Sequence, residues 1–473
     1  MTADTSPSMG RRSFLASAAA AGVGLGLGST FWQTAFATPA PLGPGPYGPI
    51  DQRRPDENGI ILPAGFRSRV IARTGDLVPG TNFVWPTAPD GQATFPTGDG
   101  GWILVTNSEW ASAELLRGVG FPSESAGALG AGVSAIRFAR NGRIADAYRI
   151  LAGSDINCAG GPTPWGTWLS GEEWDFVGVT KPQLAAAFGP AAADYFFREG
   201  SVRAGQMWEC DPTRPSEGVP LPALGLFQHE AAAVDVSTNV VYLTEDQRNG
   251  LLYRFVPDSP NIGGRPDLSS GSLQAAQVLD PGGVVTGSSA VTWIPVPDPT
   301  ATGGVPTRFQ LPAATRFQRG EGMWFDSGVV YFTTTSDDRV WAYDCASAEI
   351  SVIYDRATAG PDAPLSGADN LTVHPFTGDL YVAEDGGNME LVTITSPDDP
   401  NGRVSAPFAR FTPAAGVPQV GTELTGPCFD PSGTRLYVSS QRGIQTSSFP
   451  FPQQGITYEI TGPFRSQRRN AGR

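Results

Sequence analysis

Six short runs of the same kind recur along the chain, and they constrain its fold more than any other feature. Each run combines an aromatic or aliphatic residue, a second apolar residue and a small residue, and several end in acids. The runs cover residues 104–107, 168–173, 242–246, 331–334, 381–385 and 437–441. Strand–turn–strand units repeated every few tens of residues are typical of propeller blades.

The sequence therefore predicts an all-β protein, a six-bladed β-propeller with inserted loops and minor helices. Loops are needed because the spacing of the runs varies from about fifty to about ninety residues. An array of β-sandwiches is the alternative. The content of 59 glycines and 43 prolines favours many short elements joined by turns. The best helix candidate covers residues 181–197, with Pro182 near its start.

The N-terminus reads as an export signal. Twin arginines at 11–12 precede an apolar stretch rich in glycine and alanine, and residues 35–37 supply the small residues that signal peptidase requires. We expect a twin-arginine signal peptide at 1–37, a periplasmic or secreted location and the Tat export machinery as a partner. The apolar stretch is short, so we expect no stable membrane anchor after cleavage, a retained anchor being the alternative.

The rest of the chain divides by composition. Residues 38–60 form a lead-in rich in proline and glycine, residues 61–465 the propeller domain, and residues 466–473 a basic disordered tail. The formal net charge is −14, with no lysine or arginine run outside the termini, so we expect no nucleic-acid partner. The acidic excess either provides solubility or gathers carboxylates around bound cations. We expect a monomer.

Several catalytic classes are excluded by what the chain lacks. Its two histidines, His229 and His374, are too few for a three-histidine metal site. The run that starts at His229 ends on Ala233, where a zinc protease needs a second histidine. A G-x-S-x-G elbow, a Walker loop and a Cys-x-x-Cys pair are also missing. Disulfides among the four cysteines stay open, because an exported protein permits them.

Acids accompany the repeated strands instead, and they are the candidate metal ligands. Acids at the axial ends of several blades would converge, and only cations would let them all stay ionised. Carboxylate oxygens suit Ca²⁺, Mg²⁺, Mn²⁺ or ferric iron. Six of the candidates form three acid doublets, which are pairs of adjacent acids at 172–173, 245–246 and 384–385. Since neighbours on a strand point to opposite faces, only one member of each doublet should face a metal. The candidates are Glu172, Glu173, Glu230, Glu245, Asp246, Glu321, Asp369, Glu384, Asp385 and Glu423.

Two further residues are candidates by their position. Cys158 lies in a turn rich in glycine and proline just before an acid-bearing strand, where it is either a functional thiol or a buried apolar residue. Arg319 precedes Glu321 by two residues, so it either binds a phosphoryl group or pairs with that carboxylate.

Five blocks of the sequence together resemble the PhoX-type alkaline phosphatases. They cover residues 157–173, 229–246, 319–322, 368–385 and 423–427. The resemblance implies a six-bladed propeller whose axial pocket holds ferric iron and calcium. It makes Cys158 an iron ligand and gives iron or calcium to Glu230, Glu321 and the other acids of the blocks. It also makes Arg319 a contact of the substrate phosphate, with Arg319 and Glu321 as the catalytic pair.

The implied function is that of an exported, metal-dependent phosphomonoesterase acting on small phosphate esters. The alternatives are another metal-dependent propeller hydrolase, such as a lactonase or phosphodiesterase, and a non-catalytic binding propeller. Two histidines common in the family are replaced here, by Ser108 in the first blade and by Arg442 near the C-terminus. We expect Arg442 to bind phosphate in place of the histidine. Gly171 and Gly320 replace a family cysteine and proline.

Overall fold

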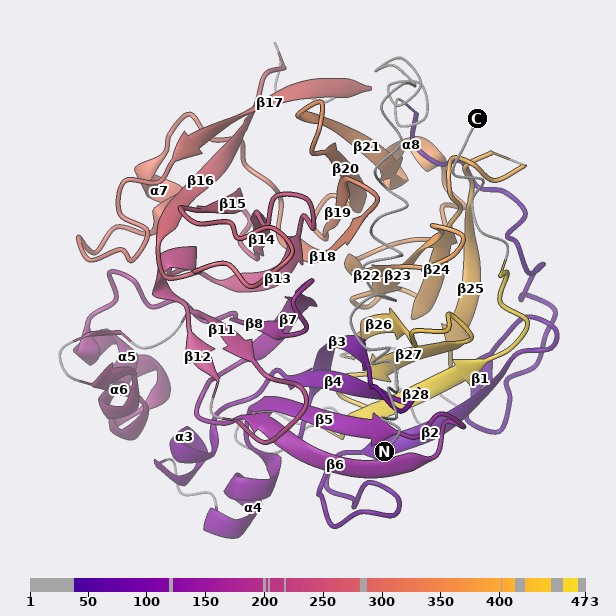
Figure 1. The fold of residues 1–473 in the computed structure, drawn as a ribbon, viewed down its shortest axis with the longest axis horizontal. Helices are drawn as coiled ribbons and strands as arrows, with labels where there is room; N and C mark the ends of the chain where they lie inside the picture. The colour runs from indigo at the N-terminus through magenta and orange to yellow at the C-terminus, as the bar shows by residue number, and fades with distance from the viewer. Residues whose placement is uncertain are drawn as a thin grey trace, which may run out of the picture.

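The computed structural model describes residues 38–118, 122–198, 201–202, 205–216, 218–280, 287–400, 402–412, 422–443 and 454–466. Within these residues antiparallel strands dominate, and their sheets surround a common axis (Figure 1). The predicted all-β propeller is confirmed, and the array of β-sandwiches is wrong. The predicted signal peptide at 1–37 and residues 467–473 of the predicted tail lie outside the described residues.

The first three blades follow one another along the chain. The first contains β3 (Pro89–Pro96), β4 (Trp102–Ser108), β5 (Gly132–Phe138) and β6 (Ile144–Leu151). The second contains β7 (Asn157–Pro162), β8 (Trp168–Glu172), β11 (Met207–Cys210) and β12 (Val219–Pro220). The third contains β13 (His229–Val234), β14 (Val241–Glu245), β15 (Leu252–Pro257), β16 (Gly271–Val278) and β17 (Ser288–Pro295).

The other three blades complete the ring. The fourth contains β18 (Gly320–Asp326), β19 (Val329–Thr334), β20 (Arg339–Asp344) and β21 (Glu349–Asp355), and β21 also pairs with β17. The fifth contains β22 (Ala368–Val373), β23 (Leu380–Glu384), β24 (Glu390–Ile394), β25 (Ser405–Phe411) and β1 (Ile60–Ile61). The sixth contains β26 (Leu424–Phe429), β27 (Arg435–Ser440), β28 (Ile456–Thr461) and β2 (Arg67–Arg73).

The innermost strands are β3, β7, β13, β18, β22 and β26, and each packs against the next around the axis. The six repeated runs of the sequence are therefore the second strands of their blades. Crowding explains why the inner strands read differently. In β7, for example, a side chain at Gly161 would place its Cβ 1.9 Å from the carbonyl oxygen of Ala232 in β13. Short strands rich in glycine and alanine carry little hydrophobic periodicity.

The sixth blade closes the ring, because it combines the two ends of the domain. The early strand β2 pairs with β28 along its whole length. The lead-in is docked as well: the amide of Ala40 donates to the carbonyl of Ile353 (2.7 Å), and β1 adds to the outer edge of the fifth blade. The lead-in predicted from composition is thus a strap across the fourth and fifth blades.

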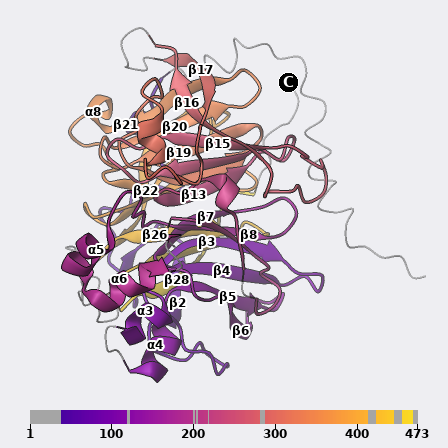
Figure 2. The same cartoon turned by 90° about the vertical axis from the view of Figure 1, so that its left-hand side faces the viewer.

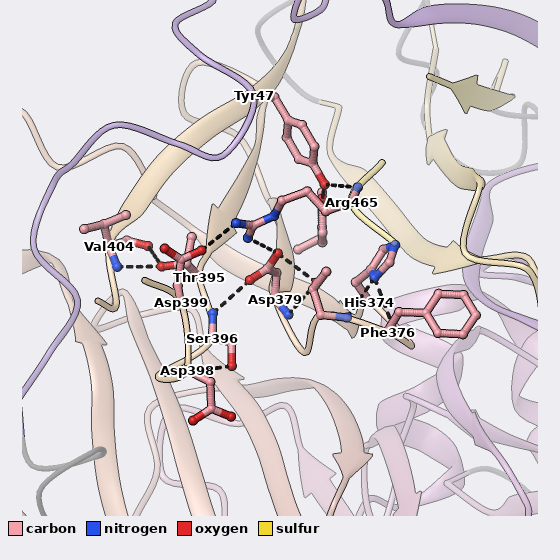
Figure 3. Close-up of polar contacts among 12 residues, drawn as sticks. Tyr47, His374, Phe376, Asp379, Thr395, Ser396, Asp398, Asp399, Val404 and Arg465 are labelled. Carbon is pink, nitrogen blue, oxygen red and sulfur yellow. Dashed lines mark hydrogen bonds and ion pairs between the residues drawn. The ribbon is translucent and has the colours of Figure 1, made fainter. Parts of the chain in front are cut away.

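A cluster of polar contacts joins the strap and the C-terminal segment on the fifth blade (Figure 3). The guanidinium of Arg465 pairs with Asp379 (2.6 Å) and with Asp399 (2.5 Å). The backbone amide of Arg465 donates to the hydroxyl of Tyr47 (3.3 Å). The side chains of Asp379 and Asp399 are 1% and 4% exposed, so Arg465 places its charge against two buried carboxylates.

Replacing Arg465 by alanine is expected to lower the free energy of unfolding by about 1–3 kcal/mol, because it removes charged hydrogen bonds to two buried carboxylates. Thermal or denaturant unfolding measures the loss. The matched control is Arg137→Ala, because the Arg137–Asp99 pair has 42% and 55% exposed side chains and should contribute almost nothing. Equal stability losses in the two variants would contradict this account.

The helices are short and peripheral. They are α3 (Ala113–Gly118), α4 (Ser123–Leu129), α5 (Lys181–Phe188), α6 (Pro190–Phe196), η2 (Pro222–Leu224), α7 (Thr307–Gln310) and α8 (Arg356–Ala359). Figure 2 shows α3 to α6 together on one side of the propeller. In the described part of the chain, no helix has the length and apolarity that a membrane span requires.

The single helix predicted over 181–197 is wrong, because two helices occupy this segment. The first ends at Gly189, which adopts a left-handed φ of 89° that suits glycine. The next residue, Pro190, lacks an amide proton and begins the second helix. At its start the first helix has the predicted Pro182 in its first turn and a capping box between Thr180 and Gln183.

Candidate metal centre

Each inner strand carries a β-bulge at the same depth, and the bulges build the centre. The register between inner and second strand shifts between residues 89 and 92, 157 and 160, 229 and 232, 320 and 323, 368 and 371, and 425 and 428. A bulge re-aims the side chain at its first extra residue. In five blades this residue has a metal-ligating group: Asp90, Cys158, Glu230, Glu321 and Asp369.

The second bulge residue is small for a steric reason. A Cβ at Gly91 would lie 2.5 Å from the Cα of Ala159, and a Cβ at Gly322 would lie 2.5 Å from the Cα of Asn370. Both distances are far below any real contact, so the neighbouring inner strands touch backbone to backbone here. The close approach of the strands brings the preceding ligating residues together.

A second tier of polar side chains comes from the residue that follows each second strand. These residues are Glu109, Glu173, Asp246, Thr335, Asp385 and Gln441. The Gln441 amide donates to Asp90 Oδ2 (2.6 Å) and to Glu109 Oε2 (2.5 Å), and the Thr335 hydroxyl donates to Glu321 Oε1 (3.0 Å). The two tiers therefore form one connected cluster at one end of the axis.

The two members of each acid doublet separate, as strand alternation predicts. The first member accepts backbone amides of nearby loops instead of entering the cluster. Glu172 accepts from Asp155 and Gln206 (both 3.1 Å). Glu384 accepts from Ser366 and Glu390 (both 2.8 Å).

Glu245 follows the same pattern with stronger partners. It accepts from the amide of Leu251 (3.1 Å), the hydroxyl of Tyr253 (2.9 Å) and the guanidinium of Arg308 (2.8 Å). The carboxylates of Glu172, Glu245 and Glu384 thus hold the loops around the centre. None of the three belongs to a group of ligating atoms among the described residues, so their assignment as ligands stays a prediction.

Three overlapping groups bring ligating atoms within 4.8 Å of one another. They are Asp90 with Glu109 and Cys158, Cys158 with Glu173 and Glu230, and Glu230 with Glu321 and Asp369. The thiol of Cys158 lies 3.7 Å from Asp90 Oδ2. Cys158 and Glu230 each belong to two groups, so the three groups form a continuous arc across five blades.

Burial and like charge strain this cluster. Burial first, and then the charge of Glu109, raises the pKa of Asp90 to about 7. Burial followed by neighbouring carboxylates also raises the pKa of Glu173, Glu230 and Asp369 well above the ordinary range. These groups would hold protons near neutral pH unless positive charge is brought in.

Two observations show that the residues fit bound cations. Among the described residues, Asp90 Oδ1 and Glu230 Oε2 are buried and have no hydrogen-bond partner, although buried polar atoms are almost always paired. In the part of the chain that the structure describes, the cluster also contains many more acids than bases, since two guanidinium groups face nine carboxyl groups. Cations would supply both the missing partners and the missing charge.

The two guanidinium groups border the cluster from different blades. Arg319 binds Asp246 with two parallel hydrogen bonds (both 2.8 Å), contacts Glu321 (2.8 Å) and lies 3.8 Å from Asp385. Its φ of 61° lies in the left-handed region, which costs energy for a residue with a side chain and is concentrated at functional sites. The predicted ion pair with Glu321 is present, and phosphoryl binding by Arg319, whose side chain is 31% exposed, stays a prediction.

Arg442 occupies the corresponding place on the sixth blade. It contacts Glu423 (3.1 Å), which the sequence also predicts to be a metal ligand, and donates to Gln441 Oε1 (3.0 Å). The side chain of Arg442 is 33% exposed. The nearby charges of Glu423, Glu109 and Asp385 act on it, so Arg319 and Arg442 share Asp385 as a neighbour.

The other residues that replace a residue common in the family have a structural role. Ser108 donates its hydroxyl to the carbonyl of Thr87. A Cβ at Gly171 would lie 2.9 Å from the carbonyl oxygen of Glu230 and a Cβ at Gly320 3.3 Å from Thr244 Cβ, so both glycines pack tightly.

The histidines have structural contacts, and the cysteines, which all lie in the described part of the chain, form no disulfides. His229 and His374 are buried and contact carbonyl oxygens (both 3.0 Å), away from the ligating atoms. The four cysteines are free thiols, and Cys158 alone belongs to a ligating group of the described residues.

Sequence reasoning missed part of the centre: Asp90, Glu109, Thr335, Asn370 and Gln441. A signal for Asp90 is present, because an acid or thiol followed by a small residue recurs as Asp90-Gly91, Cys158-Ala159, Glu230-Ala231 and Glu321-Gly322. Asn370 follows Asp369 at the same place and connects two blades, since it donates to Glu230 Oε1 (3.4 Å) and accepts from the Gly426 amide (2.7 Å).

The chain and its fold resemble known proteins. A family model described as "Alkaline phosphatase PhoX" matches residues 131–357. No curated protein sequence matches the chain. The structure of Pseudomonas fluorescens PhoX in complex with vanadate, described as a transition state analogue, aligns with a TM-score of 0.65 and 20% identity over 89% of this chain and 98% of that one.

Two further solved structures align more weakly. Regucalcin from Agrobacterium tumefaciens, described as a calcium-binding protein, has a TM-score of 0.38 and 14% identity over 85% of this chain and 98% of its own. A gluconolactonase from Xanthomonas campestris has a TM-score of 0.39 and 12% identity over 90% of this chain and all of its own.

Proposed function

Because the chain belongs, through residues 131–357, to the PhoX alkaline phosphatase family, we propose that it is an exported phosphomonoesterase that uses calcium and iron. One observation carries the proposal: the bulges of five inner strands turn four acids and one thiol toward one another. Such a cluster has no stabilising role without cations, because unpaired buried carboxylates destabilise a fold.

The kind of ligating atom in each group indicates which cation that group would hold. A thiolate suits iron better than calcium, so the groups that share Cys158 would hold iron together with Asp90 or Glu230. Calcium takes six to eight oxygen ligands, so the all-carboxylate group of Glu230, Glu321 and Asp369 would hold calcium. When bound, the cations would neutralise phosphoryl oxygens and activate the attacking oxygen.

The two arginines bind and orient the substrate in this proposal. A guanidinium recognises phosphate oxygens through parallel N–H donors. Arg319 is held in place by Asp246 and Glu321, so its orientation is fixed before substrate arrives. Arg442 approaches from another blade, beside Glu423, and would contact a different oxygen of the same phosphoryl group. A fixed pair of donors stabilises charge that develops during phosphoryl transfer.

The direct test is phosphate release from aryl and nucleotide monoesters by protein loaded with calcium and iron. We expect release well above that of the Glu321→Ala variant, since Glu321 contributes to both the cation group and the placement of Arg319. Phosphodiesters and lactones in the same panel separate the alternative hydrolases. No monoester hydrolysis above the variant would overturn the proposal, and absence of stoichiometric metal would favour a binding propeller.

Export through the twin-arginine route is proposed from residues 11–12 and the segment that follows them. Cell fractionation checks it. The unchanged chain is expected outside the inner membrane, and a variant with lysines at both positions is expected to stay in the cytoplasm. Equal distribution of the two proteins would contradict export by this route.

A further inference from the structure

A second polar cavity lies at the other end of the sheets from the metal centre. Its volume is about 590 Å³, and it is bounded by β2, β28 and the turn between β5 and β6. Three arginines line it, Arg67, Arg69 and Arg435, together with Glu459. Arg435 begins β27, whereas Gln441 follows its last residue and contacts the centre, so β27 separates the two sites by its whole length.

The arginines bring more positive charge to the cavity than its one carboxylate neutralises. Glu459 is 2% exposed and already accepts two parallel hydrogen bonds from Arg69 (2.8 and 3.0 Å). Arg435 adds a third contact to Glu459 (2.9 Å), and the hydroxyl of Tyr437 adds a fourth (2.9 Å). Arg67 donates its Nε to the neutral hydroxyl of Thr461 (3.3 Å).

Among the described residues that line the cavity, Glu459 is the one carboxylate, and the nearby Asp56 and Asp430 have other partners. Asp56 accepts from the amide and hydroxyl of Ser68 (3.2 and 2.6 Å), on the far side of β2 from the arginines by strand alternation. Asp430 accepts the backbone amides of Thr434 and Arg435 (both 2.9 Å) and so caps the turn before β27. Three guanidinium groups therefore face one carboxylate in a protein whose net charge is −14.

We propose that this cavity binds a small dianionic oxyanion, a phosphate or a dicarboxylate, independently of the metal centre. Each guanidinium has five N–H donors, and the contacts to Glu459, Thr461 and the Gly142 carbonyl use only part of them. Two surplus positive charges match two negative ones. The Cζ atom of Arg435 also lies 5.6 Å from the ring centroid of Trp102, a cation–π contact that helps to hold this side chain in place.

The test combines calorimetry with crystallographic location of the anion. Inorganic phosphate and succinate are titrated into the metal-loaded protein, and crystals soaked in tungstate show where a phosphate analogue binds. We expect tungstate between Arg67, Arg69 and Arg435. Arg67→Glu should remove that peak, weaken the corresponding binding step by about tenfold or more, and leave phosphatase activity unchanged. Arg67→Gln should give a smaller loss, and whichever of phosphate and succinate binds more tightly identifies the class of ligand.

The matched control is Arg214→Glu, which makes the same charge change at a side chain that is 75% exposed outside the cavity. It should bind like the unchanged protein. The proposal is overturned if tungstate is absent from the cavity, or if Arg67→Glu and Arg214→Glu bind phosphate and succinate equally well.

Discussion

Removing the cations with a chelator is expected to abolish phosphate release and to lower the free energy of unfolding by at least roughly 3–5 kcal/mol, the cost of one buried charge that loses its partner. The loss is large because several carboxylates share the centre, including Asp90 and Glu230, whose unpaired oxygens have no protein donor among the described residues. Activity and thermal midpoint measured before and after chelation give the result.

The control is the same chelator already saturated with calcium, which should change nothing. Adding calcium and iron back should restore both the activity and the thermal midpoint. An unchanged midpoint in the stripped protein would show that the carboxylates are stable without cations, and the proposed metal centre would then be wrong.

The pH dependence of the stripped protein gives a second readout of the same effect. The pKa of Asp90 is raised to about 7 and that of Glu230 lies well above its usual range, chiefly because of burial. Above pH ~4, near the ordinary carboxyl pKa, the unfolded chain has lost protons that the folded protein still holds. The free energy of unfolding should therefore fall as the pH rises from about 4 to about 7, by about 1.4 kcal/mol per pH unit for each such carboxyl.

Denaturant unfolding of the stripped protein at pH 5 and pH 7 measures this slope. Protein that holds its cations should show a much weaker dependence, because its carboxylates are already ionised. A stripped protein that becomes more stable toward neutral pH would contradict the sign.

Arg319→Ala is expected to lower kcat/KM by roughly 10²–10³, the usual effect of removing one preorganised donor from a developing negative charge. Arg319→Lys should recover only part of the rate, because an ammonium cannot reproduce the two parallel hydrogen bonds to Asp246. Steady-state kinetics with an aryl phosphate measure both variants.

The chain offers a matched control in Arg308. The guanidinium of Arg308 pairs with Glu245, the neighbour of Asp246 in the chain. The N–O distance is 2.8 Å, as it is between Arg319 and Asp246, but Arg308 lies behind the centre and its side chain is 12% exposed. Arg308→Ala should lower the thermal midpoint while the folded fraction keeps its activity. If the two alanine variants lose activity equally, the role of Arg319 is structural and its contact with substrate is disproved.

The second strands of the blades could be predicted from sequence, and the inner strands could not. Second strands such as β14 are buried along their whole length, so they read as apolar runs with an acid at the end. The inner strand β3 reads Pro-Asp-Gly-Gln-Ala at its start, and its bulge breaks the alternation by which a strand is recognised. Asp90 was missed for this reason.

The acid doublets show what strand alternation can predict from the sequence and what it cannot. Alternation predicted that Glu172 and Glu173 would separate, but not which of them would enter the centre. That choice depends on loops from elsewhere in the chain, because the amide of Gln206 is one of the groups that holds Glu172. Gly189 and Pro190, in contrast, are a local signal for a break between two helices, and the prediction of one helix over 181–197 overlooked it.

The way the ring closes has a consequence for biosynthesis. Arg442 and Glu423 come from the last blade, which is complete only when β28 has met β2 from the beginning of the domain. During synthesis the cluster therefore lacks one wall until β28 has been made and has paired with β2. The three groups of candidate ligands come from the first five blades, so the ring closes around them only when β28 pairs with β2.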